Sequence, residues 1–253
     1  METPINQAEI PAHNREIYIA SSLCGAEPKM DLYHSFLLMQ DCFSEYLHLL
    51  NCDNVRIREE FSHYWVILRS RITLGDMPAW DDTIRAHTVM VRRSALFVEL
   101  ETELTHRDGS LVALGRQQLC VLNIADHKPC KLDFLPELFA QPPAQAKDPS
   151  RWAGAFDPKT EEEPVYQMQI RSQDVDSNGH MNNIAYVRAM LGAYSVEELN
   201  SRSIAQAEVQ YINESYENNC LSVMRADSGS ESHVQLCDAQ GNHVTMMKIQ
   251  FKN

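Results

Sequence analysis

The same order of predicted elements occurs twice along this chain, once on each side of a stretch rich in proline, alanine and charge at residues 141–164. In each part, one strand-like segment precedes a long apolar helix, and a run of strand-like segments follows. A repeated order of this kind indicates two copies of one structural unit. Because the strands come in runs and do not alternate with helices, the pattern predicts an α+β fold, with a sheet wrapped around each helix.

The first part, residues 1–140, contains the longer of the two predicted helices. A strand is expected at 15–22, and Asp31 is a suitable N-cap for a helix of about 20 residues. Apolar residues step by three and four along this helix and predict one buried face: Leu32, Phe36, Met39, Phe43, Leu47 and Leu50. Strands are expected at 64–68, 83–91, 95–104 and 111–124, with a turn at Asp108-Gly109.

The second part, residues 165–253, repeats this plan after the predicted linker at 141–164. It opens with a strand at 165–172, and a helix is expected to start near Asn183. The apolar stripe of that helix consists of Ile184, Val187, Leu191 and Tyr194. Four strands are expected after it, at 207–213, 220–226, 233–239 and 243–251. The sequence therefore predicts a pseudo-dimer within one chain.

Composition removes several classes of function. The net charge of −13 disfavours a broad contact with nucleic acid, and neither GxxxxGK[ST] nor GxGxxG occurs. The longest apolar stretches fall short of the roughly 18–20 residues that a membrane-spanning helix needs, and no secretory signal is recognisable. Seven cysteines without a CxxC pair indicate reduced thiols, a cytosolic location and no zinc site. We therefore expect neither a metal nor a cofactor.

The densest polar segment lies at 171–191, between the first strand of the second part and its helix. It places Asp176, Asn178 and His180 at alternate positions just before a helix start, where free backbone amides favour negative charge. A carboxylate, an amide and an imidazole in such a loop suit the activation of a carbonyl and a water molecule. The alternative is an ordinary turn with Asn182 or Asn183 as helix cap. Residues 21–36, the equivalent segment of the first part, lack Asp-x-Asn-x-His, which favours the functional interpretation.

Three segments resemble one family in the right order. VDSNGHMNNIAYVRAML at 175–191 resembles the D-x-N-x-H-[VM]-N-N-x-x-Y signature of the acyl-[acyl carrier protein] thioesterases, plastid and bacterial enzymes that end fatty acid synthesis. MPAWDDTIRAHT at 77–88 is similar to the P-x-W-x-D segment of that family. AEVQYINES at 207–215 is similar to its strand ending in a catalytic glutamate.

The resemblance implies a double (tandem) hotdog fold and hydrolysis of fatty acyl-[acyl carrier protein] to free fatty acid. It assigns catalytic roles to Asp176, Asn178, His180 and Glu214. We also expect substrate contacts from Asn183 at the helix start and from Trp80 in the first hotdog, although Trp80 also fits a core or interface anchor. The resemblance also implies an N-terminal hotdog at 1–140 that shapes the acyl pocket, and a C-terminal hotdog at 165–253 that carries the catalytic residues. The expected partner is acyl carrier protein. The expected location is the bacterial cytoplasm or, for a processed organellar form, the plastid stroma.

One departure from the family concerns the nucleophile. Many plant members have cysteine directly after the glutamate, whereas this chain has Ser215, and Cys220 follows later. We therefore expect direct attack by water, activated by Glu214 or His180, with the oxyanion held at the helix start near Asn183. Asn178 would orient water or the carbonyl oxygen. Asp176 would hold His180 or Asn178 in place.

Several alternatives stay open at this point. Carrier protein is acidic and a chain at −13 repels it, so docking needs a local basic patch, for which Arg92-Arg93 or Arg171 and Arg188 are candidates. Acyl-coenzyme A is the alternative thioester. An enoyl-thioester hydratase is disfavoured, because its D-x-N-P-x-H motif places histidine five residues after aspartate. The protein could also be a non-catalytic acyl-thioester-binding protein, which would have the acyl pocket but not the catalytic activity.

Other residues carry weaker signals. Met181, Met190, Met246 and Met247 fit an acyl tunnel or an ordinary core, and Trp65 is expected to be a core or interface anchor. The remaining histidines, His127 among them, are dispersed and are expected to be ordinary surface or core residues. The sequence is compatible with a monomer or a homodimer.

Overall fold

The computed structural model describes residues 11–140, 142–154 and 163–252. The described strands form one ten-stranded antiparallel sheet in the order β1-β3-β4-β5-β2-β7-β10-β9-β8-β6. They are β1 (His13–Tyr18), β2 (His63–Leu74), β3 (Thr83–Arg93), β4 (Phe97–His106), β5 (Leu111–Asn123), β6 (Tyr166–Gln169), β7 (Ile204–Tyr211), β8 (Cys220–Ser228), β9 (Glu231–Cys237) and β10 (His243–Phe251). The predicted mixture of helices and a large antiparallel sheet is confirmed.

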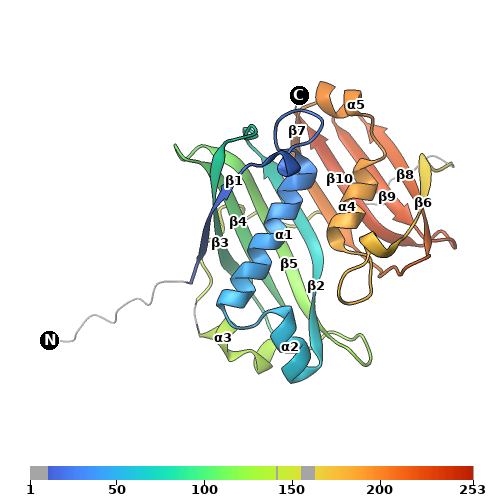
Figure 1. Cartoon of the computed structure of the whole chain (residues 1–253). Coiled ribbons are helices and arrows are strands. Elements are labelled where there is room, and N and C mark those ends of the chain that lie inside the picture. The colour runs from blue at the N-terminus through green and yellow to red at the C-terminus, as the bar shows by residue number, and fades with distance from the viewer. Residues whose placement is uncertain (1–10, 141, 155–162, 253) are drawn as a thin grey trace.

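The two longest apolar helices lie together on one face of this sheet (Figure 1). The helices are α1 (Leu32–Leu49), α2 (Asn54–Phe61), α3 (Pro136–Phe139), α4 (Asn183–Leu191) and α5 (Val196–Ser201). α1 and α4 run in opposite directions, so that their N-termini lie towards opposite ends of the helix layer (Figure 1). None of the described helices is both long and apolar enough to span a bilayer.

The predicted cap and stripe of α1 are confirmed. Asp31 Oδ1 accepts a hydrogen bond from His34 N at 3.0 Å, which satisfies one of the free amides of the first turn. Four residues of the predicted stripe are fully buried, namely Leu32, Phe36, Met39 and Leu47. The stripe of α4 is shorter than predicted, since the helix ends at Leu191, and Tyr194 lies beyond it with its hydroxyl 2.5 Å from Ser232 Oγ.

Three short helices were not predicted. α2 spans 8 residues and α5 only 6, with caps at Asp53 and Ser195, and α3 spans 4. Each is too short to show an apolar period, so cap residues were the one local signal. α2 follows the end of α1 and packs against β2, and this brings Arg58 towards the loop before α4.

β2 and β7 join the two parts of the chain into one sheet. β2 is longer than the predicted strand at 64–68, and its second half pairs with β7 from Arg69↔Gln210 to Thr73↔Gln206. Outward from this junction the strand order is β2-β5-β4-β3-β1 on one side and β7-β10-β9-β8-β6 on the other. Residues of the first part therefore lie directly beside residues of the second.

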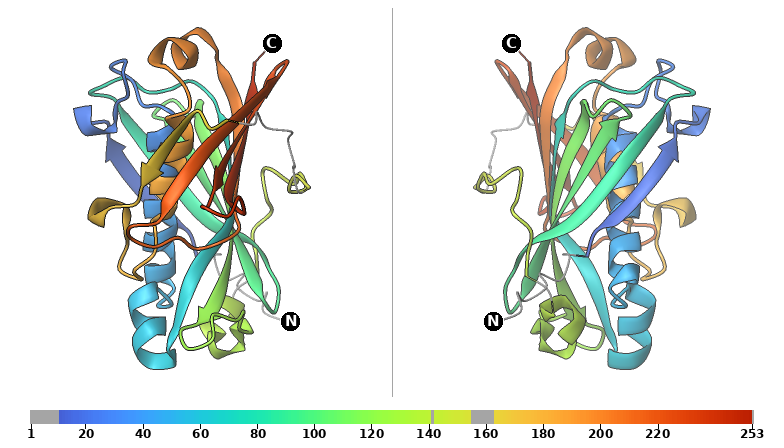
Figure 2. Two further views of the ribbon diagram at one scale, coloured as in Figure 1. Left: turned by 90° about the vertical axis from the view of Figure 1, so that its right-hand side faces the viewer. Right: turned by 90° about the vertical axis from the view of Figure 1, so that its left-hand side faces the viewer.

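Residues 142–154 cross the sheet on the face opposite the helices (Figure 2). Beneath them, Arg71 pairs with Glu208 at 2.7 Å, and Arg116 pairs with Glu99. The Trp152 ring lies 5.0 Å from the guanidinium carbon of Arg71, a cation–π arrangement. The described part of the predicted linker is thus packed on a polar sheet face. Residue 141 and residues 155–162 of that linker lie outside the described residues.

Candidate active site

Asp176 closes the turn that precedes α4. Its carboxylate accepts the backbone N–H of Asn178 at 2.8 Å, and its own N–H donates to the carbonyl of His180, also at 2.8 Å. Gly179 has φ +83°, which an L-residue adopts only at a cost, so the tight turn depends on glycine here. Asn178 and His180 are therefore positioned by the backbone of the turn.

The loop is tied to the segment that follows β7. Asn182 caps α4, its Oδ1 accepting from Ile184 N at 2.9 Å. Met181 N donates to the carbonyl of Ser215 at 2.8 Å, and His180 forms an isolated β-bridge with Tyr216. These backbone contacts bring the end of the β7 segment, including Glu214, beside His180.

Glu214 is the centre of the resulting side-chain cluster. Its Oε1 lies 3.3 Å from His180 Nδ1 and accepts the hydroxyl of Tyr64 at 3.0 Å. Its Oε2 accepts the hydroxyl of Tyr216 at 3.2 Å and lies 3.8 Å from His127 Nδ1. Both oxygens of one carboxylate are therefore directed by neighbouring polar groups, which fixes the orientation of Glu214.

The electrostatic surroundings keep the two tyrosines neutral. Burial is the main cause of the raised pKa of Tyr64, and the nearby carboxylate of Glu214 adds to it. The pKa of Tyr216 is raised for the same two reasons. Both hydroxyls therefore act as hydrogen-bond donors to Glu214 at neutral pH, and neither competes with it as a base.

A cavity of about 240 Å³ opens beside this cluster and is lined from both parts of the chain. The first part contributes mainly apolar groups from β2 and β5, including Trp65, Ile67, Leu68, Cys120 and Leu122. The second part contributes the polar groups Asp176, Asn178, His180, Asn183 and Glu214. An apolar wall facing a few convergent polar groups is typical of a small-molecule site.

The structure brings together five of the six site residues that the sequence predicts, and Trp80 is the exception. Trp80 lies in the turn before β3, where its side chain is 53% exposed and its backbone N–H donates to the Pro28 carbonyl. It is absent from the residues that line the cavity. Asn183 lines the cavity at the first position of α4, where its amide belongs to the free N–H groups of a helix start.

Four residues of the cluster were missed by sequence reasoning, three of them from the first part. Tyr64 begins the predicted strand at 64–68, and its hydroxyl lies 2.9 Å from Nδ1 of His127, a residue treated as dispersed. Arg58, on α2, donates a hydrogen bond to Asn178 Oδ1 at 2.5 Å. Tyr216 lies two residues after Glu214, and this proximity was the one sequence signal for it. The others come from α2, from the start of β2 and from the turn after β5. These segments lie beside the second part because β2 pairs with β7, a pairing that the sequence did not define.

The cysteines near the site are poor nucleophiles. Burial raises the pKa of Cys120, which lines the cavity, to about 11, so its thiol is almost entirely protonated at neutral pH. Ser215 is buried, and Cys220 lies at the exposed start of β8, outside the lining of the cavity. Among the residues that the structure describes, no three His, Cys, Asp or Glu side chains are grouped as metal ligands.

Comparison with known families supports the resemblance found in the sequence. Residues 158–253 match the model of the acyl-ACP thioesterase C-terminal domain. The chain is 23% identical over 156 residues to the chloroplastic palmitoyl-acyl carrier protein thioesterase of Cuphea hookeriana, covering 58% of this chain and 37% of the relative. It is 21% identical over 174 residues to the chloroplastic acyl-[acyl-carrier-protein] hydrolase FATB1 of Cuphea viscosissima, covering 66% and 42%. The chain thus spans about two fifths of the length of these relatives.

Three solved structures share the fold over nearly the whole chain. An acyl-ACP thioesterase from Bacteroides thetaiotaomicron has a TM-score of 0.80 at 20% identity, covering 95% of this chain and 98% of that one. The 12:0-ACP thioesterase from Umbellularia californica has a TM-score of 0.83 at 16% identity, covering 95% and 97%. A putative oleoyl thioesterase from Lactobacillus plantarum has a TM-score of 0.82 at 14% identity, covering 98% of both chains. The predicted resemblance to the acyl-ACP thioesterases is confirmed.

Proposed function

We propose that this protein hydrolyses the thioester of fatty acyl-[acyl carrier protein], releasing free fatty acid and carrier protein. The observation that carries the proposal is the pair formed by His180 and Glu214, 3.3 Å apart, beside an apolar cavity and the start of α4. The match of residues 158–253 to the thioesterase C-terminal domain supports the same chemistry.

The proposal includes a tandem hotdog with an N-terminal unit at 1–140 and a C-terminal unit at 165–253. It is supported by the two strand orders that read alike outward from the β2–β7 junction, and by one long helix against each half of the sheet. In this arrangement the N-terminal unit supplies the apolar cavity wall and Tyr64. The C-terminal unit supplies Asp176, Asn178, His180 and Glu214.

In the proposed mechanism, the thioester carbonyl lies against the first turn of α4. Backbone amides near Asn183 stabilise the oxyanion, since they lie at the positive end of the helix dipole. Glu214, with His180 beside it, removes a proton from the attacking water, and the tetrahedral intermediate then expels the thiolate. A thiolate is a good leaving group, so little acid assistance is needed. Asn178 orients water or the carbonyl oxygen, and Asp176 holds the backbone of Asn178 in place.

Docking of an acidic carrier protein requires positive charge near the cavity. Arg171 is exposed in the loop that enters the site, and Arg58 reaches Asn178 at the cavity from α2. Arg188 is tied to Asp174, and Arg93 donates to the Leu138 carbonyl, so both are already engaged. We therefore assign docking to Arg58, whose partner Asn178 is a neutral amide at the cavity, and to Arg171. The proposed location follows the carrier protein, in a bacterial cytoplasm or a plastid stroma, with the protein as a monomer or homodimer.

The test is thiol release from matched acyl chains on carrier protein and on coenzyme A, for wild type, His180→Ala and Glu214→Ala. His87→Ala and Glu217→Ala, both exposed outside the cavity, are the controls. Selective hydrolysis of the carrier-protein thioesters, lost in the first two variants alone, is the expected result. Faster hydrolysis of the coenzyme A thioesters would identify acyl-coenzyme A as the substrate instead. Binding of the thioesters without thiol release would favour a non-catalytic acyl-thioester-binding protein. Hydration of an enoyl thioester without hydrolysis would favour the hydratase.

A further inference from the structure

A second cavity, of about 560 Å³, lies at the start of α1, at the other end of the helix layer. Its walls come from the loop at 25–31, the end of β2, helix α5 and the segment 202–204. It shares no lining residue with the cavity beside Glu214. Its volume lies within the range of about 300–1,000 Å³ that is usual for small-molecule sites.

The loop of this second cavity repeats the hydrogen bonds of the catalytic loop. Gly25 N donates to the carbonyl of Lys29 at 2.9 Å, just as Asp176 N donates to that of His180 at 2.8 Å. Lys29 forms an isolated β-bridge with Ala79, as His180 does with Tyr216.

The next residue of the loop extends the correspondence. Met30 N donates to the carbonyl of Pro78 at 3.0 Å, as Met181 N donates to that of Ser215 at 2.8 Å. One residue later Asp31 caps α1, as Asn182 caps α4. The second cavity is therefore the structural counterpart of the candidate active site in the other half of the chain.

The catalytic side chains are replaced at this counterpart. Gly25, Glu27 and Lys29 stand at the positions of Asp176, Asn178 and His180, and Met77 precedes Pro78 where Glu214 precedes Ser215. A Cβ at position 25 would come within 2.3 Å of Asp31 Oδ2, so a side chain there would require the Asp31 carboxylate to move. Because position 29 is not histidine and position 77 is not glutamate, the His–Glu pair proposed for the candidate active site has no counterpart here.

The second cavity keeps an apolar wall. Leu74, Met77, Leu191, Leu199 and Ile204 line it and are only partly buried, so they leave apolar surface in contact with the cavity. Three of the five come from the second part of the chain, whereas most of the apolar wall of the candidate active site comes from the first. Such a surface suits an alkyl chain.

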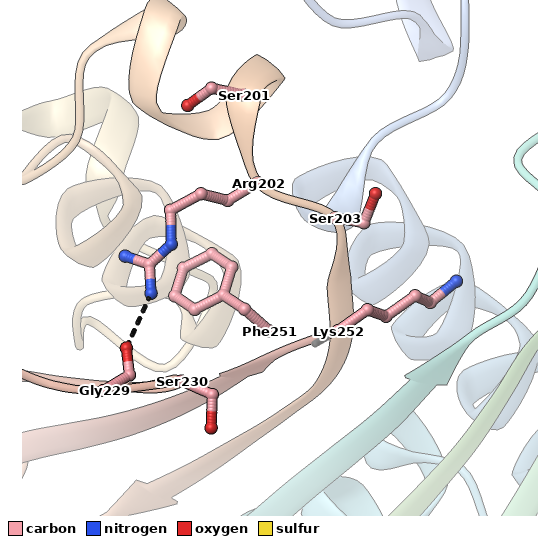
Figure 3. Close-up of a pocket in the computed structure, with 7 residues that line it drawn as sticks. All are labelled: Ser201, Arg202, Ser203, Gly229, Ser230, Phe251 and Lys252. Atoms are coloured by element: carbon pink, nitrogen blue, oxygen red, sulfur yellow. Dashed lines mark hydrogen bonds between the residues drawn. The ribbon is translucent and has the colours of Figure 1, made fainter.

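Two lysines provide positive charge at this wall. Lys29 and Lys252 both line the cavity and are exposed, and neither forms an ion pair with the described residues. Figure 3 shows the Lys252 side chain extending away from Arg202, whose guanidinium lies 3.5 Å from the centre of the Phe251 ring and donates to the Gly229 carbonyl. The ammonium of Lys252 is thus the available cation on this side.

Three carboxylates also line the cavity. Asp31 Oδ1 is 2.7 Å from His34 Nδ1 and accepts the backbone N–H of the same residue. Glu27 and Asp76 are exposed, where water and salt screen their charge. Lys29 and Lys252 are exposed and screened in the same way, so their attraction for an anion is the modest one of exposed ion pairs.

We propose that this cavity is a second acyl-binding site, which takes the anion of a free fatty acid and does not hydrolyse thioesters. The carboxylate lies between Lys29 and Lys252, and the alkyl chain follows the wall formed by Met77, Leu191 and Leu199. The assignment rests on the proposed function in one respect: the counterpart cavity is taken to hold an acyl chain. A free fatty acid is also the product of the proposed reaction.

The experiment uses dodecanoic acid with a photoreactive diazirine near the end of its chain. After irradiation with the full-length protein, the labelled peptides are identified by mass spectrometry. We expect label in 191–204 as well as in 64–68. In the Lys29→Gln/Lys252→Gln variant, label in 191–204 falls about fivefold at equal probe concentration, since two exposed ion pairs are lost. Label in 64–68 and the rate of thiol release stay unchanged, and Lys131→Gln, at an exposed lysine outside the cavity, behaves as wild type.

The outcomes separate this inference from the proposed function. Label confined to 64–68, or label in 191–204 that the double variant does not reduce, overturns the second site even when thiol release is intact. A protein that releases no thiol but is labelled in 191–204 in a lysine-dependent way overturns the proposed function and supports the second site.

Discussion

Replacement of Glu214 by glutamine tests the proposed base with little change in shape. Glutamine keeps an acceptor oxygen for the hydroxyl of Tyr64 but removes the negative charge and the basic oxygen. Two unit charges 3.3 Å apart, the distance from Glu214 Oε1 to His180 Nδ1, interact by about 5 kcal/mol at an effective dielectric constant near 20 and by about 1.3 kcal/mol in water. The side chains are 30% and 15% exposed, so the effect lies between these limits.

We therefore expect kcat of Glu214→Gln to fall by about 10²- to 10³-fold, within the range usual for loss of a general base. KM should change by less than about threefold, because the cavity wall is untouched. The assay is steady-state thiol release from an acyl-[acyl carrier protein], with Glu217→Gln as the exposed, matched control. A kcat within threefold of wild type, with an unchanged unfolding midpoint, would refute the assignment of Glu214.

Three further variants test other parts of the account. Tyr64→Phe removes a hydrogen-bond donor to Glu214 Oε1 and should lower kcat/KM about tenfold. Tyr18→Phe, at an exposed tyrosine, should leave kcat/KM unchanged. The same kcat/KM for the two variants would show that Tyr64 has no role in the site. Gly179→Ala places a Cβ at φ +83°, so it should lower the free energy of unfolding in urea by about 1–2 kcal/mol and also lower the rate of thiol release. An unchanged free energy of unfolding and an unchanged rate would contradict the role of the turn. Arg71→Met leaves Glu208 buried without its ion-pair partner and should destabilise the protein by about 3–5 kcal/mol in the same assay. The double variant Arg71→Met/Glu208→Leu should recover most of this loss. A double variant as unstable as Arg71→Met would show that the broken ion pair is not the cause.

Local patterns predicted the helices and strands where each carried its own signal. The stripe from Leu32 to Leu47 and the cap at Asp31 defined α1, and the strand-like runs at 83–91 and 95–104 correspond to β3 and β4. The Asp-x-Asn-x-His segment identified the loop before α4 because backbone turn, cap and polar side chains lie within a few residues of each other. Such features depend on near neighbours, which sequence periodicity reports well.

Features set by long-range pairing were not predictable in this way. Tyr64 and His127 join the site because β2 pairs with both β5 and β7, a register that no local pattern encodes. The packing of residues 142–154 over Arg71 and Arg116 also depends on distant charges, and their Pro- and Ala-rich sequence resembles a flexible linker. Trp80 illustrates the reverse case, a residue in a family-like segment that the structure places on an exposed turn.

The central claim is that His180 and Glu214 act together on one water molecule. It is tested most directly by a double-mutant cycle on kcat/KM, with His180→Ala, Glu214→Gln and the combined variant assayed on one acyl-[acyl carrier protein]. Residues that act as a unit show strongly non-additive losses. We predict that the combined variant loses no more than about threefold beyond the worse single variant. Losses that multiply across the two positions would contradict the account, since they would show independent roles.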